Sequence, residues 1–331
     1  MSAKNTKQKS RAGGTVRAVF MSLFVLAAAV LVGICFNGNA YRINFLPTLS
    51  QFMGAIGFPE YPRYETTAGD VTVHFIDVGQ GDCTLIMTDT VNVLIDCGEE
   101  EQADSVIRYI ESRGITKLDL VIATHPHSDH IGGMYKILQS FQVGEVLMPE
   151  LAYDMIPFSN AYSSMIAVME KKSIPVHYAA AGDTIRLGGG TYLDVLGPLH
   201  NDYDTLNNFS VVVKLTHGRN KFLFAADMER ASENDMLNTG ADVSAAVLKV
   251  AHHGSTSSST AAFLKQVSPR YAVISVGRDN VYGHPTPEVI SRLQALECEI
   301  ITTAGDGNIV FVSDGGTLTW YTESGKRSAA A

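Results

Sequence analysis

Three histidines and an aspartate lie close together, directly after an apolar segment of the chain. The run Leu118–Thr124 leads into the sequence HPHSDHIGG, and a helical pattern follows at Met134–Phe141. The cluster consists of His125, His127, Asp129 and His130. A short apolar run of this kind is typical of a buried strand. The chain must therefore fold so that a loop between a strand and a helix presents these four side chains.

Imidazole and carboxylate groups are the usual protein ligands of zinc and of other first-row divalent metals. Because the side chains project from a loop, those of His125 and His127 can point to one position while those of Asp129 and His130 point to a neighbouring position. The cluster predicts two divalent metal ions, with zinc preferred and manganese as the alternative. A chance group of solvated histidines is disfavoured by the density of ligands directly after a strand.

Strands and helices alternate on both sides of the cluster. Strands are expected at 71–78, 83–87, 91–96, 118–124, 145–148, 176–178, 184–187, 192–196, 211–216, 221–226, 246–250, 271–276, 299–303, 308–312 and 317–321. Helices are expected at 103–113, 134–141, 162–172, 229–237, 260–266 and 287–297. This order predicts an α/β (α+β) fold in which two mixed sheets pack face to face with helices outside.

The domain organisation follows from the same reading. No polar linker interrupts residues 70–322, which we expect to form one domain. Residues 37–69 contain several prolines and show no helical or alternating pattern of apolar residues, so we expect a linker there. Residues 323–331 are expected to form a flexible tail.

The N-terminus reads as a targeting element. Residues 1–17 are basic, and residues 18–36 contain no charge and are long enough to span a bilayer as a helix. The basic flank predicts residues 1–17 in the cytoplasm and the rest outside it. Two alternatives remain. An uncleaved signal anchor gives a single-pass membrane protein, and cleavage after Ala40 gives a secreted one.

The charge of the chain is distributed unevenly. The formal net charge is −9, and residues 1–36 contain five basic and no acidic residues, so the remainder carries −14. Tight, non-specific binding of long nucleic acids depends on Lys and Arg contacts to phosphates. The acidic body therefore argues against such binding and favours small or short substrates.

The chain resembles the metallo-β-lactamase superfamily, whose signature is H-x-H-x-D-H. More specifically, it is similar to the hydrolase module of the ComEC/Rec2 competence proteins and to stand-alone relatives of that module. The matching segments are FIDVGQGDC (75–83), LIDCG (94–98), ATHPHSDHIGG (123–133), NNFSVVVKL (207–215), FLFAAD (222–227), LKVAHHGS (248–255), ISVGRDNVYGHPTPEV (274–289) and TTAGDGNIVF (302–311). The resemblance covers residues 75–321 and implies a four-layer αββα sandwich with a two-metal hydrolase site.

The resemblance also implies roles for carboxylates and histidines outside the cluster. Asp227 corresponds to the carboxylate that bridges two metals, and Asp96 to the one that supports the histidine loop. His253, or the adjacent His252, completes the second metal together with Asp129 and His130. Asp129 and Asp227 are therefore candidates both for metal binding and for catalysis.

Three further residues are expected beside the site. The turn that contains Gln80 and Asp82 lies next to the metals in this reading, so these side chains orient water or substrate, or else serve only the turn. His284 lies in a loop after a buried strand and either binds an oxyanion, acts as an acid or is a structural histidine.

The chain departs from the classical pattern at one position. Classical members supply a third histidine to the first metal from a strand before the bridging aspartate, and the matching region here contains Asn208 and no histidine. The first metal then has His125, His127 and Asp227, with water or an asparagine carbonyl in the remaining position. His200 lies upstream and is the less favoured substitute.

Cys83 and Cys97 lie on consecutive predicted strands around a turn centred near residue 90. In an exported protein this arrangement is compatible with a disulfide across the two strands. Free buried thiols are the alternative, and Cys97 as a metal ligand is a third.

A pair of divalent ions suits the hydrolysis of a phosphodiester, because it activates a water and stabilises the charged oxygens. The sequence therefore predicts a phosphodiesterase or nuclease type of hydrolase that acts on a small phosphodiester or a short nucleic acid. The alternatives are a non-catalytic metal-binding module and an accessory protein of DNA uptake. No protein partner can be inferred.

Overall fold

The computed structural model describes residue 64 and residues 66–327, all of which belong to one compact unit. The predicted basic tail and membrane helix, residues 1–36, lie outside the described residues, as does most of the predicted linker. Within the described part, no helix is long and apolar enough to cross a membrane.

The first sheet has eight strands in the order β15-β14-β1-β2-β3-β4-β5-β6. The strands are β1 (Val71–Phe75), β2 (Thr84–Met87), β3 (Asn92–Ile95), β4 (Lys117–Ile122), β5 (Gln142–Met148), β6 (Val176–Tyr178), β14 (Ile309–Ser313) and β15 (Leu318–Thr322). Neighbours from β3 to β6 run parallel, and the other neighbouring pairs are antiparallel.

The second sheet has seven strands in the order β13-β12-β11-β10-β9-β8-β7. The strands are β7 (Thr184–Gly188), β8 (Thr191–Gly197), β9 (Val212–His217), β10 (Asn220–Phe224), β11 (Val247–Lys249), β12 (Tyr271–Ile274) and β13 (Glu299–Thr302). Neighbours from β10 to β13 are parallel and the rest antiparallel. Both sheets are therefore mixed, as predicted.

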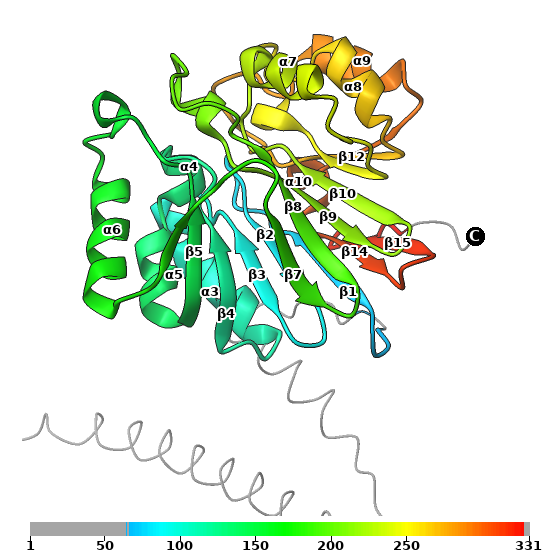
Figure 1. The fold of residues 1–331 in the computed structure, drawn as a ribbon. Coiled ribbons are helices and arrows are strands. Elements are labelled where there is room, and N and C mark those ends of the chain that lie inside the picture. The colour runs from blue at the N-terminus through cyan, green and yellow to red at the C-terminus, as the bar shows by residue number, and fades with distance from the viewer. Residues whose placement is uncertain (1–63, 65, 328–331) are drawn as a thin grey trace, which may run out of the picture. The chain divides into compact units, whose positions relative to one another are not determined.

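Helices cover the outer faces of the two sheets (Figure 1). The first sheet is covered by α3 (Ala103–Ser112), α5 (Met134–Ser140) and α6 (Asn160–Lys172), and the second by α7 (Arg230–Thr239), α8 (Ala261–Val267) and α9 (Pro287–Gln294). The short helices are α4 (Ser128–Ile131), α10 (Thr303–Asp306), η1 (Glu100–Gln102), η2 (Tyr153–Met155), η3 (Leu206–Phe209) and η4 (Ala251–Gly254). The predicted four-layer sandwich is confirmed.

The alternation of apolar residues explains the layers. In β3, Val93 and Ile95 lie in the core between the sheets, whereas Leu94 packs under the helices of the first sheet. In β10, Phe222 and Phe224 lie between the sheets. Because successive side chains of a strand point to opposite faces, a continuous apolar run supplies both an inner and an outer core.

The loops that carry the candidate site residues meet at one edge of the sandwich. Asp96 follows β3, His125–His130 follows β4, Asp227 follows β10, and His252 and His253 follow β11. All four strands run parallel to a neighbour, and the carboxyl ends of such strands are the usual place for a ligand site in α/β proteins.

The predicted disulfide is wrong. Both Cys83 and Cys97 are buried free thiols. The hairpin register pairs Thr84 with Ile95, which places Cys83 opposite Asp96 rather than opposite Cys97. The alternative of free buried thiols holds, and among the described residues no group of possible metal ligands includes Cys97.

Candidate metal centre

Asp96 anchors the histidine loop. It is fully buried and accepts hydrogen bonds from the backbone N (2.9 Å) and Oγ1 (2.7 Å) of Thr124. Its Oδ2 also lies 2.8 Å from Nδ1 of His130. A partner on one ring nitrogen fixes the orientation of a metal-binding histidine, so the Nε2 atom of His130 is directed to the other side, towards Asp227.

Asp227 lies between two pairs of histidines and is 2% exposed. Its Oδ1 atom lies 3.2 Å from Nε2 of His130 and 3.6 Å from Nε2 of His253. Its Oδ2 atom lies 3.8 Å from Nε2 of His125 and 3.7 Å from Nε2 of His252. One carboxylate therefore faces two separate groups of ring nitrogens.

The group on the Oδ1 side includes Asp129. Oδ2 of Asp129 lies 3.2 Å from Nε2 of His253 and 4.0 Å from Nε2 of His130. Ligand atoms of Asp129, His130, Asp227 and His253 all lie within 4.8 Å of one another, and we call these four residues the Asp129 cluster. Tetrahedral zinc holds its nitrogen and oxygen ligands about 3.3 Å apart, so these distances suit a divalent ion.

The group on the Oδ2 side is built around His125 and His127. Nε2 of His125 lies 3.0 Å from Nδ1 of His127, again close to the spacing of two ligands of one ion. We call His125, His127, His252 and Asp227 the His125 cluster. Asp227 belongs to both clusters.

His252 has the surroundings of a metal-binding histidine. Its Nδ1 atom lies 3.1 Å from Oγ of Ser257 and 3.6 Å from Oε1 of Glu229, which leaves Nε2 directed at Asp227. Metal-binding histidines usually donate their second ring N–H to a carboxylate or another acceptor in this way. The sequence offered His252 only as a substitute for His253, whereas both contact Asp227.

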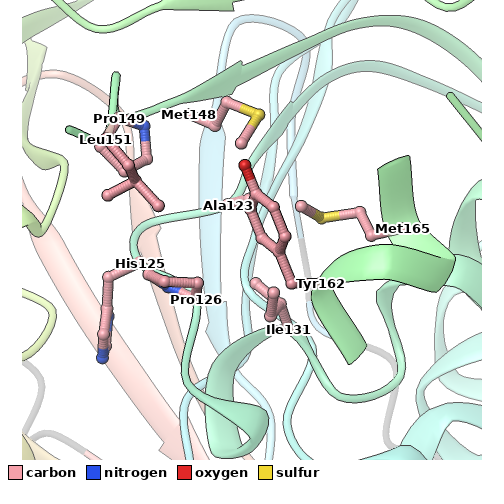
Figure 2. Close-up of a pocket in the computed structure, with 9 residues that line it drawn as sticks. All are labelled: Ala123, His125, Pro126, Ile131, Met148, Pro149, Leu151, Tyr162 and Met165. Carbon is pink, nitrogen blue, oxygen red and sulfur yellow. The ribbon is translucent and has the colours of Figure 1, made fainter. Parts of the chain in front are cut away.

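An apolar pocket supports the loop from behind (Figure 2). It is lined by Ala123, His125, Pro126, Ile131, Met148, Pro149, Leu151, Tyr162 and Met165. Its volume of about 10 Å³ is close to the minimum that one water needs. In Figure 2 the imidazole of His125 points away from Tyr162 and Met165. The pocket is therefore packing that holds the loop, and it is too small for a substrate group.

The buried atoms of the site fit divalent ions. Within the described part of the chain, Nε2 of His130, Nε2 of His253 and Oδ1 of Asp227 are buried without a hydrogen-bond partner. Buried polar atoms are normally hydrogen-bonded. The two nitrogens lie 3.2 and 3.6 Å from Oδ1 of Asp227 without a hydrogen bond, an arrangement that suits a cation bound between these atoms. Imidazole nitrogens and carboxylate oxygens suit zinc and manganese.

The carboxylates control the protonation of the histidines. Burial by itself lowers the pKa of His253, but the carboxylates of Asp227 and Asp82 outweigh burial and raise it to about 10. The same balance raises the pKa of His130 well above its usual value, with Asp227 as the largest raising contribution. At His125, burial and the neighbouring His130 hold the pKa well below its usual value. A metal that binds the Asp129 cluster must therefore displace protons.

A cavity of about 290 Å³ opens onto both clusters. It is lined by Gln80, His127, Ser128, Asp129, Asp227, His252, His253, Tyr282 and His284. The amide oxygen of Gln80 accepts a hydrogen bond from the backbone N of Gly277 (3.2 Å), and Nδ1 of His284 is buried without a partner among the described residues. Both residues line this cavity beside the two clusters.

Asp82, Asn208 and His200, which the sequence offered for the site, do not line this cavity. Asp82 is buried behind the Asp129 cluster. The side-chain oxygen of Asn208 accepts hydrogen bonds from the backbone N atoms of Glu229 and Ser232 at the start of α7. The side chain of His200 is 53% exposed and lies 3.9 Å from Asp235, so it does not replace the missing histidine.

Three residues at the site were not expected from the sequence, namely Lys249, Glu229 and Ser257. Nζ of Lys249 lies 2.8 Å from Oδ2 of Asp82, and the lysine side chain is 2% exposed. A charged residue inside an apolar strand is costly unless it is paired. That sequence feature could have indicated Lys249, whereas nothing local distinguishes Glu229 or Ser257.

The fold and the site together define a class of proteins in which a two-sheet sandwich carries a histidine- and aspartate-lined metal centre at one edge. A family model described as "Metallo-beta-lactamase superfamily" matches residues 76–278. The chain belongs to the metallo-β-lactamase superfamily.

The curated relatives include a ComE operon protein and a competence protein. ComE operon protein 3 of Bacillus subtilis (strain 168) is 27% identical over 266 residues, which cover 75% of this chain and 34% of that protein. Competence protein ComA of Neisseria gonorrhoeae is 28% identical over 257 residues, which cover 77% of this chain and 34% of that protein. The chain thus spans about a third of the length of these relatives, and the predicted ComEC-like resemblance is confirmed.

Among solved structures, the metallo-beta-lactamase fold protein YhfI from Bacillus subtilis matches with a TM-score of 0.49 at 14% identity. The match covers 74% of this chain and 100% of that chain.

Proposed function

We propose that this protein is a phosphodiesterase that uses two divalent metal ions, zinc or manganese, and acts on a small phosphodiester or a short nucleic acid. The observation that carries the proposal is the position of the Asp227 carboxylate between two groups of histidine nitrogens. A carboxylate shared in this way suits a pair of neighbouring ions.

The Asp129 cluster would hold one ion and the His125 cluster the other. His252, whose Nε2 atom lies 3.7 Å from Oδ2 of Asp227, would supply a further nitrogen to the His125 cluster in place of the third histidine that the sequence lacks. A bound pair of divalent ions supplies an activated water near neutral pH and neutralises negative charge on phosphoryl oxygens.

The protein's own residues bind and orient the diester. Asp129 is 24% exposed, lines the cavity and would orient the attacking water by accepting a hydrogen bond from it. His284 lines the same cavity and can donate a hydrogen bond to a phosphoryl oxygen. Its loop is held by Asn280, whose side-chain Oδ1 accepts from the backbone N of His284 (3.0 Å) and whose Nδ2 donates to the backbone O of His284 (2.7 Å).

The negative charge near the cavity favours a short substrate over a long polyanion. Glu99 accepts a hydrogen bond from Ser128 (2.9 Å), a cavity residue, and so adds negative charge beside Asp129. Together with the −14 charge of residues 37–331, this acidic rim disfavours a long polyanion.

We also propose that residues 18–36 anchor the protein in the membrane with the catalytic domain outside the cytoplasm. A signal peptide cleaved after Ala40 is the alternative. Protease treatment of intact cells and alkaline extraction of their membranes distinguish the two. An anchored protein is digested from outside and stays with the membrane, and a cleaved one is found in the medium or periplasm.

A role as an accessory protein of DNA uptake is the second candidate function. It is favoured by the names of the competence relatives. Loss of transformation in a deletion strain, restored by the wild type but not by His127→Ala, would favour it.

The test of the enzyme is metal content and cleavage of bis-p-nitrophenyl phosphate by the full chain, compared with His127→Ala and Asp227→Ala. His177→Ala is the control, because its side chain is 63% exposed on β6 and pairs with Glu145. We expect two ions per wild-type chain and turnover that only the first two variants lose. A wild type with two ions and no turnover on a panel of phosphodiesters indicates the non-catalytic module instead.

A further inference from the structure

Lys249 is a buried cation directly behind the metal centre. It ends β11, three residues before His252, and its side chain is 2% exposed. Its Nζ atom lies 2.8 Å from Oδ2 of Asp82 and 2.9 Å from the carbonyl oxygen of Val250. It does not line the 290 Å³ cavity, so it cannot touch a substrate there.

Asp82 connects this cation to the Asp129 cluster. Its Oδ1 atom lies 3.3 Å from Nδ1 of His253, which also lies 2.8 Å from the carbonyl oxygen of Ser275. The backbone N of Asp82 donates to the backbone O of Asp129 (3.0 Å). Lys249 thus fixes one oxygen of a carboxylate whose other oxygen faces a proposed metal ligand.

Negative charge is concentrated at this place. Asp82, Asp96 and Asp227 are each at most 5% exposed, and Asp129 lies beside them. Buried charges persist only when they are paired and hydrogen-bonded. Lys249 places an ammonium group in contact with one member of this group, Asp82.

We propose that Lys249 is a positioning residue of the metal centre, which holds Asp82 against Nδ1 of His253 so that Nε2 of His253 stays directed at Asp129 and Asp227. This inference rests on the proposed function, because it assigns Lys249 to the Asp129 cluster of that same site.

The contacts predict an effect on metal affinity and not only on folding. Without Lys249, Asp82 is a buried carboxylate without a cation, and it must leave its place beside His253 or lose its charge. His253 then keeps its hydrogen bond to the carbonyl of Ser275 but loses the carboxylate oxygen that lies 3.3 Å from its Nδ1 atom. Loss of an outer contact of this kind typically lowers metal affinity by roughly 10–100-fold.

The experiment measures zinc binding to the full chain by competition with a chromophoric chelator. We expect Lys249→Met to weaken one of the two zinc sites by roughly 10–100-fold and to leave the other unchanged. Lys221→Met is the matched control. Lys221 lies on the adjacent strand β10, and its Nζ atom is also 2.8 Å from an aspartate, Asp242, which lies outside the site. The zinc affinities of the Lys221→Met protein should equal those of the wild type.

A double variant separates positioning from simple loss of charge. If Lys249 acts through Asp82, adding Lys249→Met to Asp82→Asn lowers zinc affinity no further than Asp82→Asn alone. Independent effects would add, and additivity would overturn the proposal. This comparison replaces the buried ion pair by two neutral side chains, so it remains decisive if Lys249→Met alone does not fold.

Thermal unfolding of the metal-free variants identifies a purely structural role. A folded Lys249→Met protein with a lower melting temperature and wild-type zinc affinities would also overturn the proposal. The readout is independent of turnover. A wild type that binds two zinc ions but cleaves no phosphodiester overturns the proposed activity and leaves the Lys249 test intact.

Discussion

His252 and His253 are adjacent in the chain, yet their Nε2 atoms contact different oxygens of the same carboxylate, Asp227. Both residues have left-handed backbone angles, with φ of 50° and 54°. Such angles are uncommon for residues other than glycine and cluster at functional sites. This turn of the backbone lets neighbouring imidazoles serve two separate clusters.

The first prediction concerns these two histidines. We expect His252→Ala and His253→Ala each to reduce the metal content from two ions to one, because each removes a ligand from a different cluster. Elemental analysis after dialysis measures this, with His177→Ala as the control that keeps both ions. Loss of the same ion in both variants would show that His252 belongs to the Asp129 cluster.

The second prediction concerns Asp96. Asp96→Asn removes the charged partner of Nδ1 of His130, and we expect zinc affinity to fall by roughly 10–100-fold. The rise in melting temperature on adding zinc should shrink accordingly, since that rise depends on affinity. An unchanged rise in a folded variant would mean that Thr124 alone keeps the loop in place.

The third prediction concerns the pH dependence of metal binding. The pKa of His253 is about 10 because nearby carboxylates outweigh its burial, so its proton competes with metal at neutral pH. Affinity should therefore rise with pH between about 6 and 9, by about one log unit per pH unit for each displaced proton. Calorimetry in buffers of different ionisation enthalpy measures the protons released. Binding without proton release would contradict the raised pKa.

The fourth prediction concerns acid stability and a histidine outside the site. Burial, and then the charge of Arg113, lower the pKa of His74 to about 3. Since the unfolded chain takes up this proton near pH 6.5, stability is present above that pH and is lost as the pH falls towards 3. Between pH 7 and pH 5 the wild type should lose about 2 kcal/mol more than His74→Gln. Urea unfolding of both proteins with a chelator present measures the difference, and parallel losses would refute it.

The fifth prediction concerns the turn under the Asp129 cluster. A Cβ atom on Gly81 would lie 2.2 Å from the backbone O of Asp129, so Gly81→Ala must displace the metal loop and should weaken zinc binding. Gly79→Ala is the matched control, because Gly79 has a positive φ of 70° but no atom within 4 Å of its added Cβ. It should lower stability by about 1–2 kcal/mol without changing zinc affinity. Equal zinc affinities in both variants would contradict this account.

Local patterns were sufficient to predict much of this molecule. The ligand cluster from His125 to His130, the apolar runs of the strands and the periodic faces of the helices are encoded by neighbouring residues. The face-to-face packing of two mixed sheets followed from the order of strands and helices along the chain. The sequence predicted the ends of the helices and strands less accurately than their existence. The strand predicted over 71–78 ends at Phe75, and the loop that follows it contains Asp82, which lies behind the site.

Contacts between distant segments were decided only by the tertiary structure. A one-residue difference in hairpin register put Cys83 opposite Asp96 and removed the predicted disulfide. Two consecutive left-handed residues turned His252 towards the His125 cluster, and the approach of β11 to the loop after β1 paired Lys249 with Asp82. The sequence determined which chemical groups the centre contains. Register, backbone dihedral angles and the packing of the sheets decided which of them face one another, because these depend on contacts that no local pattern records.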